Sequence, residues 1–503
     1  MMVGSGDETM STDELQTPPT RRTATGQLDP AAGLNPVDRC RWINRRAALS
    51  PLAEDRREGQ PAGQHTPWRI APEPLALPAR AIEQLRRLGE PLLAFYRAAN
   101  RLYLDSARGS QPAWVHRYLD AGKPDGLRDY ARMNRFKGQL PAVIRPDIFL
   151  TERGPVATEL DSVPGGIGNT AFLNDAYSEL GFPVVGGARG MVEGFKRMVE
   201  GVTTAARPVL AVVVSEEARD YRPEMLYLED ELNRRGLCTH VLRPEQLTFR
   251  EEGLSFHDGV FEHNVDVIYR FFEMFDLKNI PKAELLMYAN KKERVVVTPP
   301  FKYFLEEKLL FALFHHPALR RFWLDSLGQE HDELLRGLMP RTWVLDPREL
   351  PPHAVIPDLQ VNGQPVQSWA QLFNTTKKNR DFVIKASGFS ELAWGSHGVS
   401  FAFDQSNEVW QASLARSLDA FPATPFVLQE FHKSPKVPMR FYNCANGEIR
   451  SLEGRARLCP YYFVSGGQAE LGGILATIVP PDKKAIHGML DGVMTPVMPE
   501  PET

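Results

Sequence analysis

The chain has 503 residues, of which 43% are hydrophobic and 24% charged, a composition typical of globular proteins. This length exceeds what one hydrophobic core usually fills, so we expect two or three packed lobes. The formal net charge of −4 provides no basic surface of the kind that drives nucleic-acid binding, and no apolar run approaches the roughly 20 residues that span a bilayer. We therefore expect neither a nucleic-acid partner nor a membrane partner.

The cysteines and the N-terminal composition point to a cytoplasmic location. Cys40, Cys238, Cys444 and Cys459 are far apart in sequence, and their spacing fits neither a metal-ligand motif nor a dense disulfide framework. Residues 1–66 are rich in Gly, Pro, Ser, Thr, Asp and Arg and lack the apolar core of a signal peptide. We expect this range to be a disordered tail.

Residues 67–200 predict a helical region followed by a hairpin. Apolar residues recur at helical spacing from 78 to 108, where Pro91 is expected to kink or split the helix. Residues 142–151 and 156–161 are strand-like and flank a turn sequence, Glu-Arg-Gly-Pro.

Residues 201–297 predict an α/β lobe. The run 209–214 is typical of a buried strand, 224–235 of a helix, and 238–242 and 265–272 of two further strands. The fold class expected from this alternation is α/β with several lobes.

Residues 298–503 predict the last lobe together with C-terminal strands. An amphipathic helix is expected over 302–314, and strands at 382–385 and 399–403 joined by a glycine-bearing loop. An apolar strand at 425–431 follows, and 440–479 is expected to alternate short strands and turns.

The hairpin gathers charged side chains on one face. Arg145 and Asp147 share a face of the first strand, and Glu159 and Asp161 share a face of the second. With the turn centred near Arg153, Asp147 lies opposite Glu159, and a divalent cation such as Mg²⁺ relieves the repulsion between like charges. A solvated hairpin face with a local ion pair is the alternative.

The glycine loop is a candidate phosphate site. Lys385 ends a buried strand, and the loop that follows contains Gly388, Gly395 and Gly398, whose backbone N–H groups suit a polyphosphate. The alternative is a flexible hairpin whose lysine reaches solvent.

Two further features accompany the loop. Lys308 is nearly surrounded by apolar residues near a helix start, although it also fits the charged face of an amphipathic helix. Gln429 and Glu430 close an apolar strand where an adenine base could take a hydrogen bond.

The order of these segments along the chain, with the charged hairpin before the lysine-bearing segments, resembles that of the circularly permuted ATP-grasp superfamily. The resemblance is to the synthetase domain of glutathionylspermidine synthase in particular. Arg145-Pro-Asp147 and Glu159-Leu-Asp161 look like the family's Arg-x-Asp and Glu-x-Asn segments. The segment around Lys308 is similar to the family's Asn-Lys pair that opens a Leu/Ala-rich helix, and Lys385 and Gln429-Glu430 occupy the places of the second ATP lysine and the adenine hinge.

The resemblance implies a nucleotide site and its metal. Asp147, Glu159 and Asp161 would be the magnesium ligands, and the two lysines with the loop would bind ATP. Three departures from the pattern are an Asp at 161 and a Glu at 307 where the family has Asn, and the lack of any counterpart to the amidase domain. An α/β preATP-grasp-like lobe is expected at 201–297.

The function implied is an ATP- and Mg²⁺-dependent carboxylate–amine ligase that acts through an acyl phosphate on small-molecule substrates. Arg145 is a candidate to stabilise the transferring phosphoryl group. Among the arginines of the C-terminal strands we select Arg455 as a further catalytic candidate, because guanidinium groups suit carboxylates and phosphates. A catalytically inactive nucleotide-binding or scaffold protein is the alternative, and a nucleotide-sugar glycosyltransferase centred on 209–270 is a third.

Overall fold

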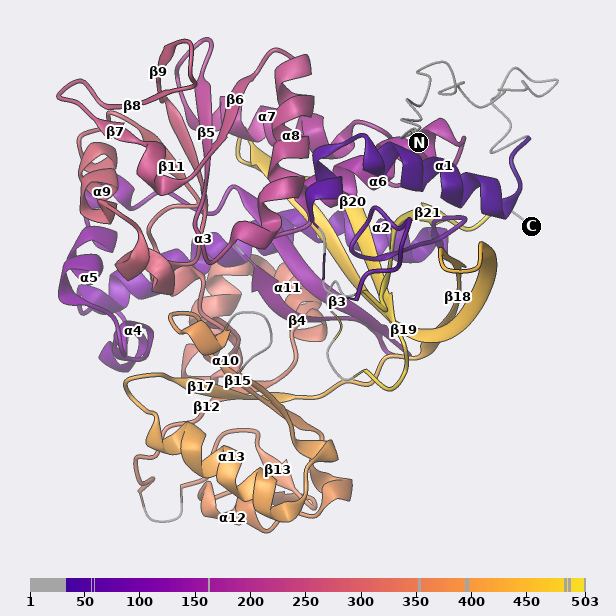
Figure 1. The fold of residues 1–503 in the computed structure, drawn as a ribbon. Helices are drawn as coiled ribbons and strands as arrows, with labels where there is room; N and C mark the ends of the chain where they lie inside the picture. Colours follow the sequence, from indigo (N-terminus) through magenta and orange to yellow (C-terminus); the bar gives the residue numbers. More distant parts are fainter. Residues whose placement is uncertain are drawn as a thin grey trace, which may run out of the picture.

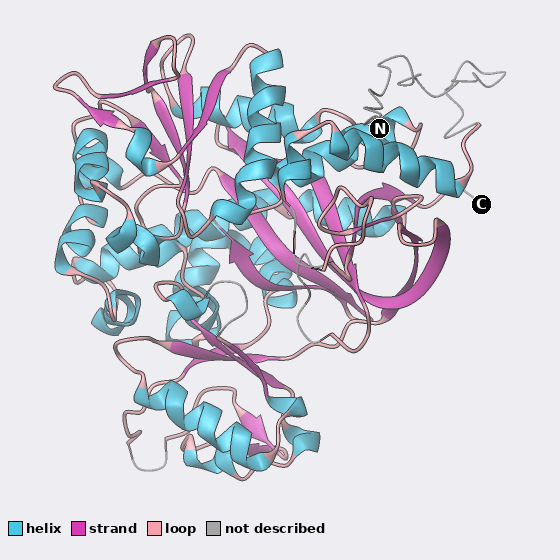
Figure 2. Cartoon of the chain, viewed as in Figure 1, coloured by secondary structure: helices cyan, strands magenta, loops and turns pink. Residues whose placement is uncertain are grey.

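The computed structural model describes residues 33–501 except 56, 58, 162, 352–353, 394–397, 484–485 and 487–489. The described chain is a mixed α/β fold with five sheets (Figures 1 and 2). No helix in these ranges is both long and apolar enough to cross a membrane. The helices are α1 (Pro36–Ala48), α2 (Ala79–Arg87), α3 (Gly89–Ala107), α4 (Ala113–Asp120), α5 (Asp125–Ala131), α6 (Ile167–Glu179), α7 (Gly190–Val202), α8 (Arg222–Arg234), α9 (Ala283–Lys291), α10 (Leu309–His315), α11 (Arg320–Leu338), α12 (Ala370–Phe373) and α13 (Asn407–Asp419).

The central sheet joins the two ends of the described chain. Its order is β1-β21-β20-β19-β3-β4, with β18 added beside β19 and β2 beside β21. The hairpin therefore pairs directly with a C-terminal strand (Figure 1). The strands are β1 (Arg69–Ile70), β2 (Leu75–Leu77), β3 (Val143–Thr151), β4 (Gly154–Asp161), β18 (Lys436–Asn443), β19 (Glu448–Ser465), β20 (Gln468–Val479) and β21 (Val493–Pro499).

Side-chain alternation builds a hydrophobic core on each face of this sheet. Ile144 and Leu458 lie in one core with α3, α10 and α11, whereas their neighbours Val143 and Cys459 lie in a second core with α1, α6, α7 and α8. Helices cover both faces, so the middle of the sheet is buried.

The second lobe is the α/β lobe. Its parallel sheet has the order β11-β10-β5-β6, and the small antiparallel sheet β7-β8-β9 lies beside it at the top of Figure 1. The strands are β5 (Val209–Val214), β6 (Cys238–Leu242), β7 (Thr248–Phe249), β8 (Leu254–His257), β9 (Glu262–Asn264), β10 (Val267–Phe271) and β11 (Val296–Thr298). The strands predicted at 209–214 and 238–242 are confirmed.

The third lobe carries the glycine loop and lies at the bottom of Figure 1. Its antiparallel sheet β12-β17-β15-β16 has its own core with α12 and α13. The strands are β12 (Thr342–Val344), β13 (Gln360–Val361), β14 (Gln364–Pro365), β15 (Phe382–Ala386), β16 (Val399–Phe401) and β17 (Phe426–Glu430).

Part of the N-terminal segment expected to be disordered is folded. Residues 1–32 lie outside the described residues, but α1 begins directly after its cap, since the Asn35 side chain accepts a hydrogen bond from the Asp38 N–H. Cys40, Ile43 and Ala47 of α1 are fully buried in the second core. The disorder prediction is therefore wrong for the described part of residues 33–66, because this short apolar stripe packs against the rest of the chain.

Two further predictions about the last lobe are wrong. The segment 302–314 is not one amphipathic helix: α10 begins only at Leu309 and is buried on all sides. The residues before it include buried polar side chains that are individually bonded, with the Lys302 ammonium donating to Asn100 Oδ1 over 2.8 Å. The short strands expected over 440–479 are instead the long strands β18 to β20, which belong to the central sheet.

Candidate active site

A cavity of about 410 Å³ opens where the three lobes meet. Side chains from the hairpin, the C-terminal strands, the end of β10, the start of α10 and strand β15 all reach its wall. The charged and polar side chains of this wall include Arg145, Glu159, Asp161, Glu224, Glu273, Glu306, Lys308, Lys385, Arg457 and Thr477.

The pairing of the hairpin is the one predicted. Asp147 lies opposite Glu159, and Arg145 lies opposite Asp161. On the next strand pair, Arg457 lies opposite Thr477, and the Arg457 guanidinium contacts the Asp147 carboxylate over 2.8 Å. A polar row thus crosses four strands of the central sheet beside the cavity.

Asp147 is bonded to its neighbours in this polar row. Its carboxylate lies 3.0 Å from an Arg145 nitrogen and 2.8 Å from an Arg457 nitrogen, and it accepts a weak bond from the Cys459 thiol. Only 2% of the residue is exposed, and Asp147 is not among the residues that line the cavity. In this structure Asp147 thus pairs with two guanidinium groups beside the cavity, and its role as a magnesium ligand stays a prediction.

Glu159 and Asp161 do reach the cavity. The side chain of Glu159 is 32% exposed and lies 3.5 Å from the Lys308 ammonium. Burial would raise the pKa of Glu159, but the neighbouring Lys308 and Lys385 outweigh it and lower that pKa. Asp161 bonds to Arg145 over 2.8 Å, and its pKa is raised by burial and by the nearby Asp147 and Glu159.

The two predicted lysines come from different lobes and both line the cavity near Glu159. The Lys385 ammonium donates to the Thr158 carbonyl over 2.9 Å, which ties β15 to the hairpin. Burial lowers the pKa of Lys385 to about 8, whereas Glu159 and Glu273 outweigh burial and raise the pKa of Lys308. Two cations from distant parts of the chain therefore act electrostatically on one carboxylate, and Lys308 forms an ion pair with it.

The glycine loop is fastened by Glu307, the residue that replaces the family's Asn. The Glu307 carboxylate accepts from the Gly388 N–H at 2.9 Å, the Phe389 N–H at 3.3 Å and the Ser387 hydroxyl. The Lys123 ammonium lies 2.5 Å from the same carboxylate. The first N–H groups expected to face a phosphate thus bind an internal anion.

The remaining loop and hinge residues are placed as follows. Gly398 closes the loop, since its N–H donates to the Leu392 carbonyl over 2.7 Å, whereas Gly395 lies outside the described residues. Gln429 is buried and lines a small hollow of about 10 Å³ together with Glu159 and Lys308. Glu430 faces a different hollow and lies 3.8 Å from His432.

The structure does not bring Arg455 to the cavity. Its guanidinium donates to the carbonyls of Pro481 and Lys483 at 2.6 and 2.7 Å. Arg457, two residues further along β19, lines the cavity instead. Spacing along one strand does not reveal which arginine meets the hairpin, and a catalytic role for Arg455 stays a prediction.

Sequence reasoning missed three acids of the cavity wall, Glu224, Glu273 and Glu306. Burial raises the pKa of both Glu273 and Glu306, which also repel each other, and Glu306 pairs with Arg270. Burial likewise raises the pKa of Glu224 to about 7, although it accepts from two N–H groups at the start of α6. Glu273 could have been found, because it closely follows a buried parallel strand, where ligand-binding side chains collect.

Unpartnered polar atoms in the wall fit a polar ligand. Glu306 Oε2, Arg145 Nε, Arg457 Nε and Thr477 Oγ1 are buried without a hydrogen-bond partner among the described residues. Such atoms cost free energy unless a ligand or water satisfies them. Together with two lysines and the carboxylates of Glu159 and Asp161, the wall offers donors for phosphate and oxygens for a cation such as Mg²⁺.

At the level of the fold, the predicted resemblance agrees with a solved structure of glutathione synthetase-like fold. The structure is similar to that of a glutathione synthetase-like effector from Globodera pallida in its apoform, with a TM-score of 0.55, 11% identity and coverage of 95% of this chain and 100% of that chain. A candidate γ-glutamylcysteine synthetase from Methylobacillus flagellatus matches with a TM-score of 0.38, 13% identity and coverage of 80% and 84%, too low a score to carry an argument.

Sequence comparison adds nothing to this structural likeness. No protein-family model matches the chain, and no curated protein matches it. At 11% identity the likeness concerns the fold alone.

Proposed function

We propose that the chain is an ATP- and Mg²⁺-dependent ligase that joins a small-molecule carboxylate to an amine. The observation that carries this proposal is that Lys308, paired with Glu159, and Lys385, bonded to Thr158, line one cavity whose wall contains unpartnered buried polar atoms. The order of the hairpin before the lysine-bearing lobe supports a circularly permuted ATP-grasp chain, which stays a prediction.

The residues divide into three roles in this proposal. Lys308 and Lys385 bind the phosphates of ATP, and the loop with Gly388 and Gly398 covers them. Glu159 and Asp161 hold Mg²⁺, which would supply charge neutralisation at the phosphates. Asp147 holds Arg145 and Arg457 in place, so that the guanidinium groups lie beside the reacting carboxylate.

The reaction proposed is the transfer of the γ-phosphoryl group of ATP to the substrate carboxylate. ADP leaves, an acyl phosphate forms, and the amine then displaces inorganic phosphate to give the amide. Positioning and positive charge provide most of the acceleration in such transfers. The closed loop keeps water from hydrolysing the acyl phosphate.

A second candidate function is a nucleotide-binding protein without catalysis. Two observations favour it: Glu307 occupies the loop N–H groups that a phosphate would use, and the hollow beside Gln429 has only about 10 Å³. In this case the closed arrangement would be the resting form of a sensor or scaffold.

Calorimetry of ATP binding with and without Mg²⁺ tests both candidates. We expect Mg²⁺-dependent binding in the wild type, lost in Glu159→Ala, and kept in Glu453→Ala, an exposed acid on β19 of the same sheet. ADP release with a panel of carboxylates and amines then separates the ligase from the non-catalytic binder. ATP binding that changes neither with Mg²⁺ nor with the Glu159 substitution would contradict the proposed metal site. A complete absence of ATP binding would contradict both candidate functions.

A further inference from the structure

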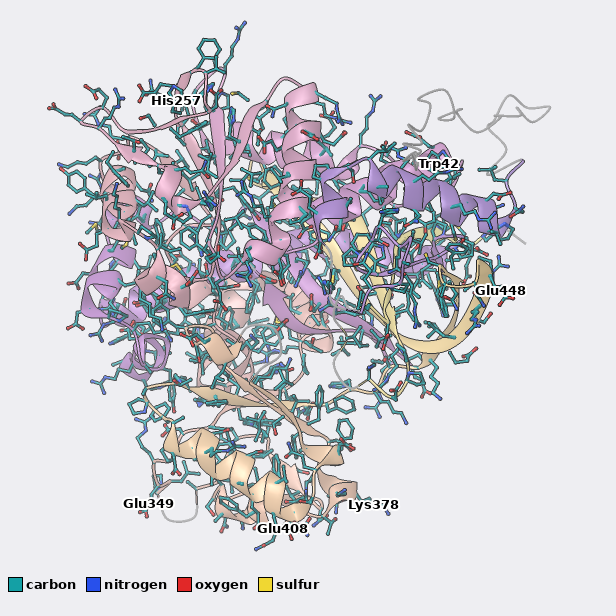
Figure 3. All side chains as sticks on the ribbon, in the orientation of Figure 1. Trp42, His257, Glu349, Lys378, Glu408 and Glu448 are labelled. Carbon is teal, nitrogen blue, oxygen red and sulfur yellow. The ribbon has the colours of Figure 1, made fainter. Side chains whose placement is uncertain are left out.

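Two histidines and a cysteine meet in the α/β lobe, outside the cavity. Cys238 and His240 lie on β6, and His263 lies on β9 of the small neighbouring sheet. One ligand atom from each lies within 4.8 Å of the other two, and no other such group of three is found in the described ranges. The group lies in the region of His257, which is labelled at the top of Figure 3.

Backbone geometry brings these side chains together. Cys238 and His240 are two residues apart on a strand, so they project from the same face of β6, the edge strand of the parallel sheet. His263 pairs in register with Phe256, and the Phe256 ring contacts both imidazoles, with ring centroids 4.7 Å from His240 and 5.1 Å from His263. One buried aromatic ring therefore holds both imidazoles against the edge of the lobe.

Each imidazole also has a carboxylate at one ring nitrogen. His240 Nδ1 lies 3.9 Å from Glu229, while its Nε2 faces the Cys238 sulfur at 3.7 Å. His263 Nε2 lies 2.7 Å from Asp258, whose other oxygen accepts from two N–H groups of its own turn. Histidines that bind a metal commonly use one nitrogen for the metal and the other for a carboxylate.

We propose that Cys238, His240 and His263 form a binding site for a divalent cation of the zinc class. A tetrahedral zinc with sulfur and nitrogen ligands places those two atoms about 3.6 Å apart, given bond lengths of about 2.3 and 2.0–2.1 Å. The observed separation of Cys238 Sγ from His240 Nε2 is 3.7 Å. The other separations, up to 4.8 Å, close by rotation of partly exposed side chains.

The ligand set selects the class of cation. A thiolate and two neutral imidazoles are soft or borderline ligands, which favour zinc over magnesium or calcium. The nearby carboxylates of Asp258 and Glu229 add negative charge around the site. The His240 and His263 side chains are each 22% exposed, so a cation can enter from solvent. Bound metal would clamp the β7-β8-β9 sheet to the edge strand β6.

Cobalt binding to the reduced full-length protein tests this site, because Co²⁺ replaces zinc and reports a thiolate ligand by its sulfur-to-cobalt absorption. We expect one Co²⁺ per chain with that absorption and its displacement by Zn²⁺. Cys238→Ser should remove the thiolate band, and His263→Gln should weaken Co²⁺ affinity by about tenfold or more. Cys444→Ser, another partly exposed free cysteine, should change neither.

The outcomes separate clearly. The thiolate band in the wild type, lost with Cys238→Ser and kept in Cys444→Ser, supports the site. A wild type that binds no stoichiometric Co²⁺, or a band that survives Cys238→Ser, overturns it and leaves a packed aromatic cluster. If Cys238→Ser does not fold, which circular dichroism would reveal, His263→Gln and His240→Gln decide instead: Co²⁺ affinity unchanged in both variants overturns the site.

Discussion

Asp147 illustrates how a single carboxylate changes its role between sequence and structure. In the sequence it resembles a metal ligand, yet in the folded protein it lies between Arg145 and Arg457 and does not reach the cavity. The hairpin register is the one predicted, with Asp147 opposite Glu159. The contacts of the Asp147 side chain, however, depend on the neighbouring strand β19, which supplies Arg457.

Removing Asp147 is therefore predicted to damage stability rather than magnesium binding. Asp147→Ala leaves the buried Arg145 and the half-buried Arg457 without their shared anion, which costs about 3–5 kcal/mol of the free energy of unfolding. Urea denaturation measures this, with the exposed Asp129→Ala as the matched control. A stable Asp147→Ala protein that has lost Mg²⁺-dependent ATP binding would support the predicted metal-ligand role instead.

Lys385 gives a prediction about pH. Burial lowers its pKa to about 8 from an ordinary value of 10.5. Between these values the unfolded chain binds more protons than the folded chain, so this group makes stability rise with pH across that window. ATP affinity, which requires the charged ammonium, should fall over the same window.

Calorimetry across about pH 7 to 10 measures this fall, and Lys385→Arg should flatten it because arginine stays charged. Lys308 should not contribute to this fall, because neighbouring carboxylates raise its pKa and keep its ammonium charged across this range. An ATP affinity that is constant with pH in the wild type would show that Lys385 does not bind phosphate.

At the scale of elements, the glycine loop is held by close packing as well as by Glu307. A Cβ at Gly388 would lie 2.6 Å from the Glu306 carbonyl oxygen, so no larger residue fits without moving the loop. The tight approach places the loop against the segment that leads into α10 and Lys308. Loop and lysine are thus positioned together, although 80 residues of sequence separate Glu307 from Ser387.

Gly388→Ala is accordingly predicted to displace the loop and to weaken ATP binding by about tenfold or more, since small misplacements of binding groups are costly. Gly337→Ala is the control, because nothing lies within 4 Å of a Cβ there. Hydrogen exchange of residues 387–393 should accelerate in the first variant and stay unchanged in the second. Equal ATP affinity in both variants would argue against a role for the loop.

At the scale of the whole molecule, the three lobes are joined tightly around the cavity. The third lobe contacts the central sheet through Lys385 and Thr158, and it contacts the segment before α10 through Glu307. The hollow beside Gln429 is too small for an adenine base in this arrangement. If a nucleotide base binds there, the lobes must first separate.

This closed arrangement predicts slow nucleotide association. Stopped-flow measurements with a fluorescent ATP analogue should give an association rate constant below ~10⁵ M⁻¹ s⁻¹, since binding that requires a conformational change falls below the usual range. Glu307→Gln weakens the bonds that fasten the loop and should raise the rate. An equally slow rate in that variant would place the barrier elsewhere.

The sequence by itself determined the local elements and the polar hairpin. Strand periodicity and the turn residues predicted β3 and β4, and their register placed Asp147 opposite Glu159 as observed. The buried strand of Lys385 and the order of the motifs were also readable, because apolar runs and turn signals are local properties.

Only the tertiary structure decided which of these residues share a cavity. The choice of Arg457 over Arg455, the neutralisation of Asp147 and the cluster of Cys238 with His263 all depend on contacts between strands distant in the chain. Such long-range contacts leave no periodic signal in sequence, because they are set by packing of whole lobes. The helix α1 was not predicted for the same reason, since a short apolar stripe folds only against a core that other segments supply.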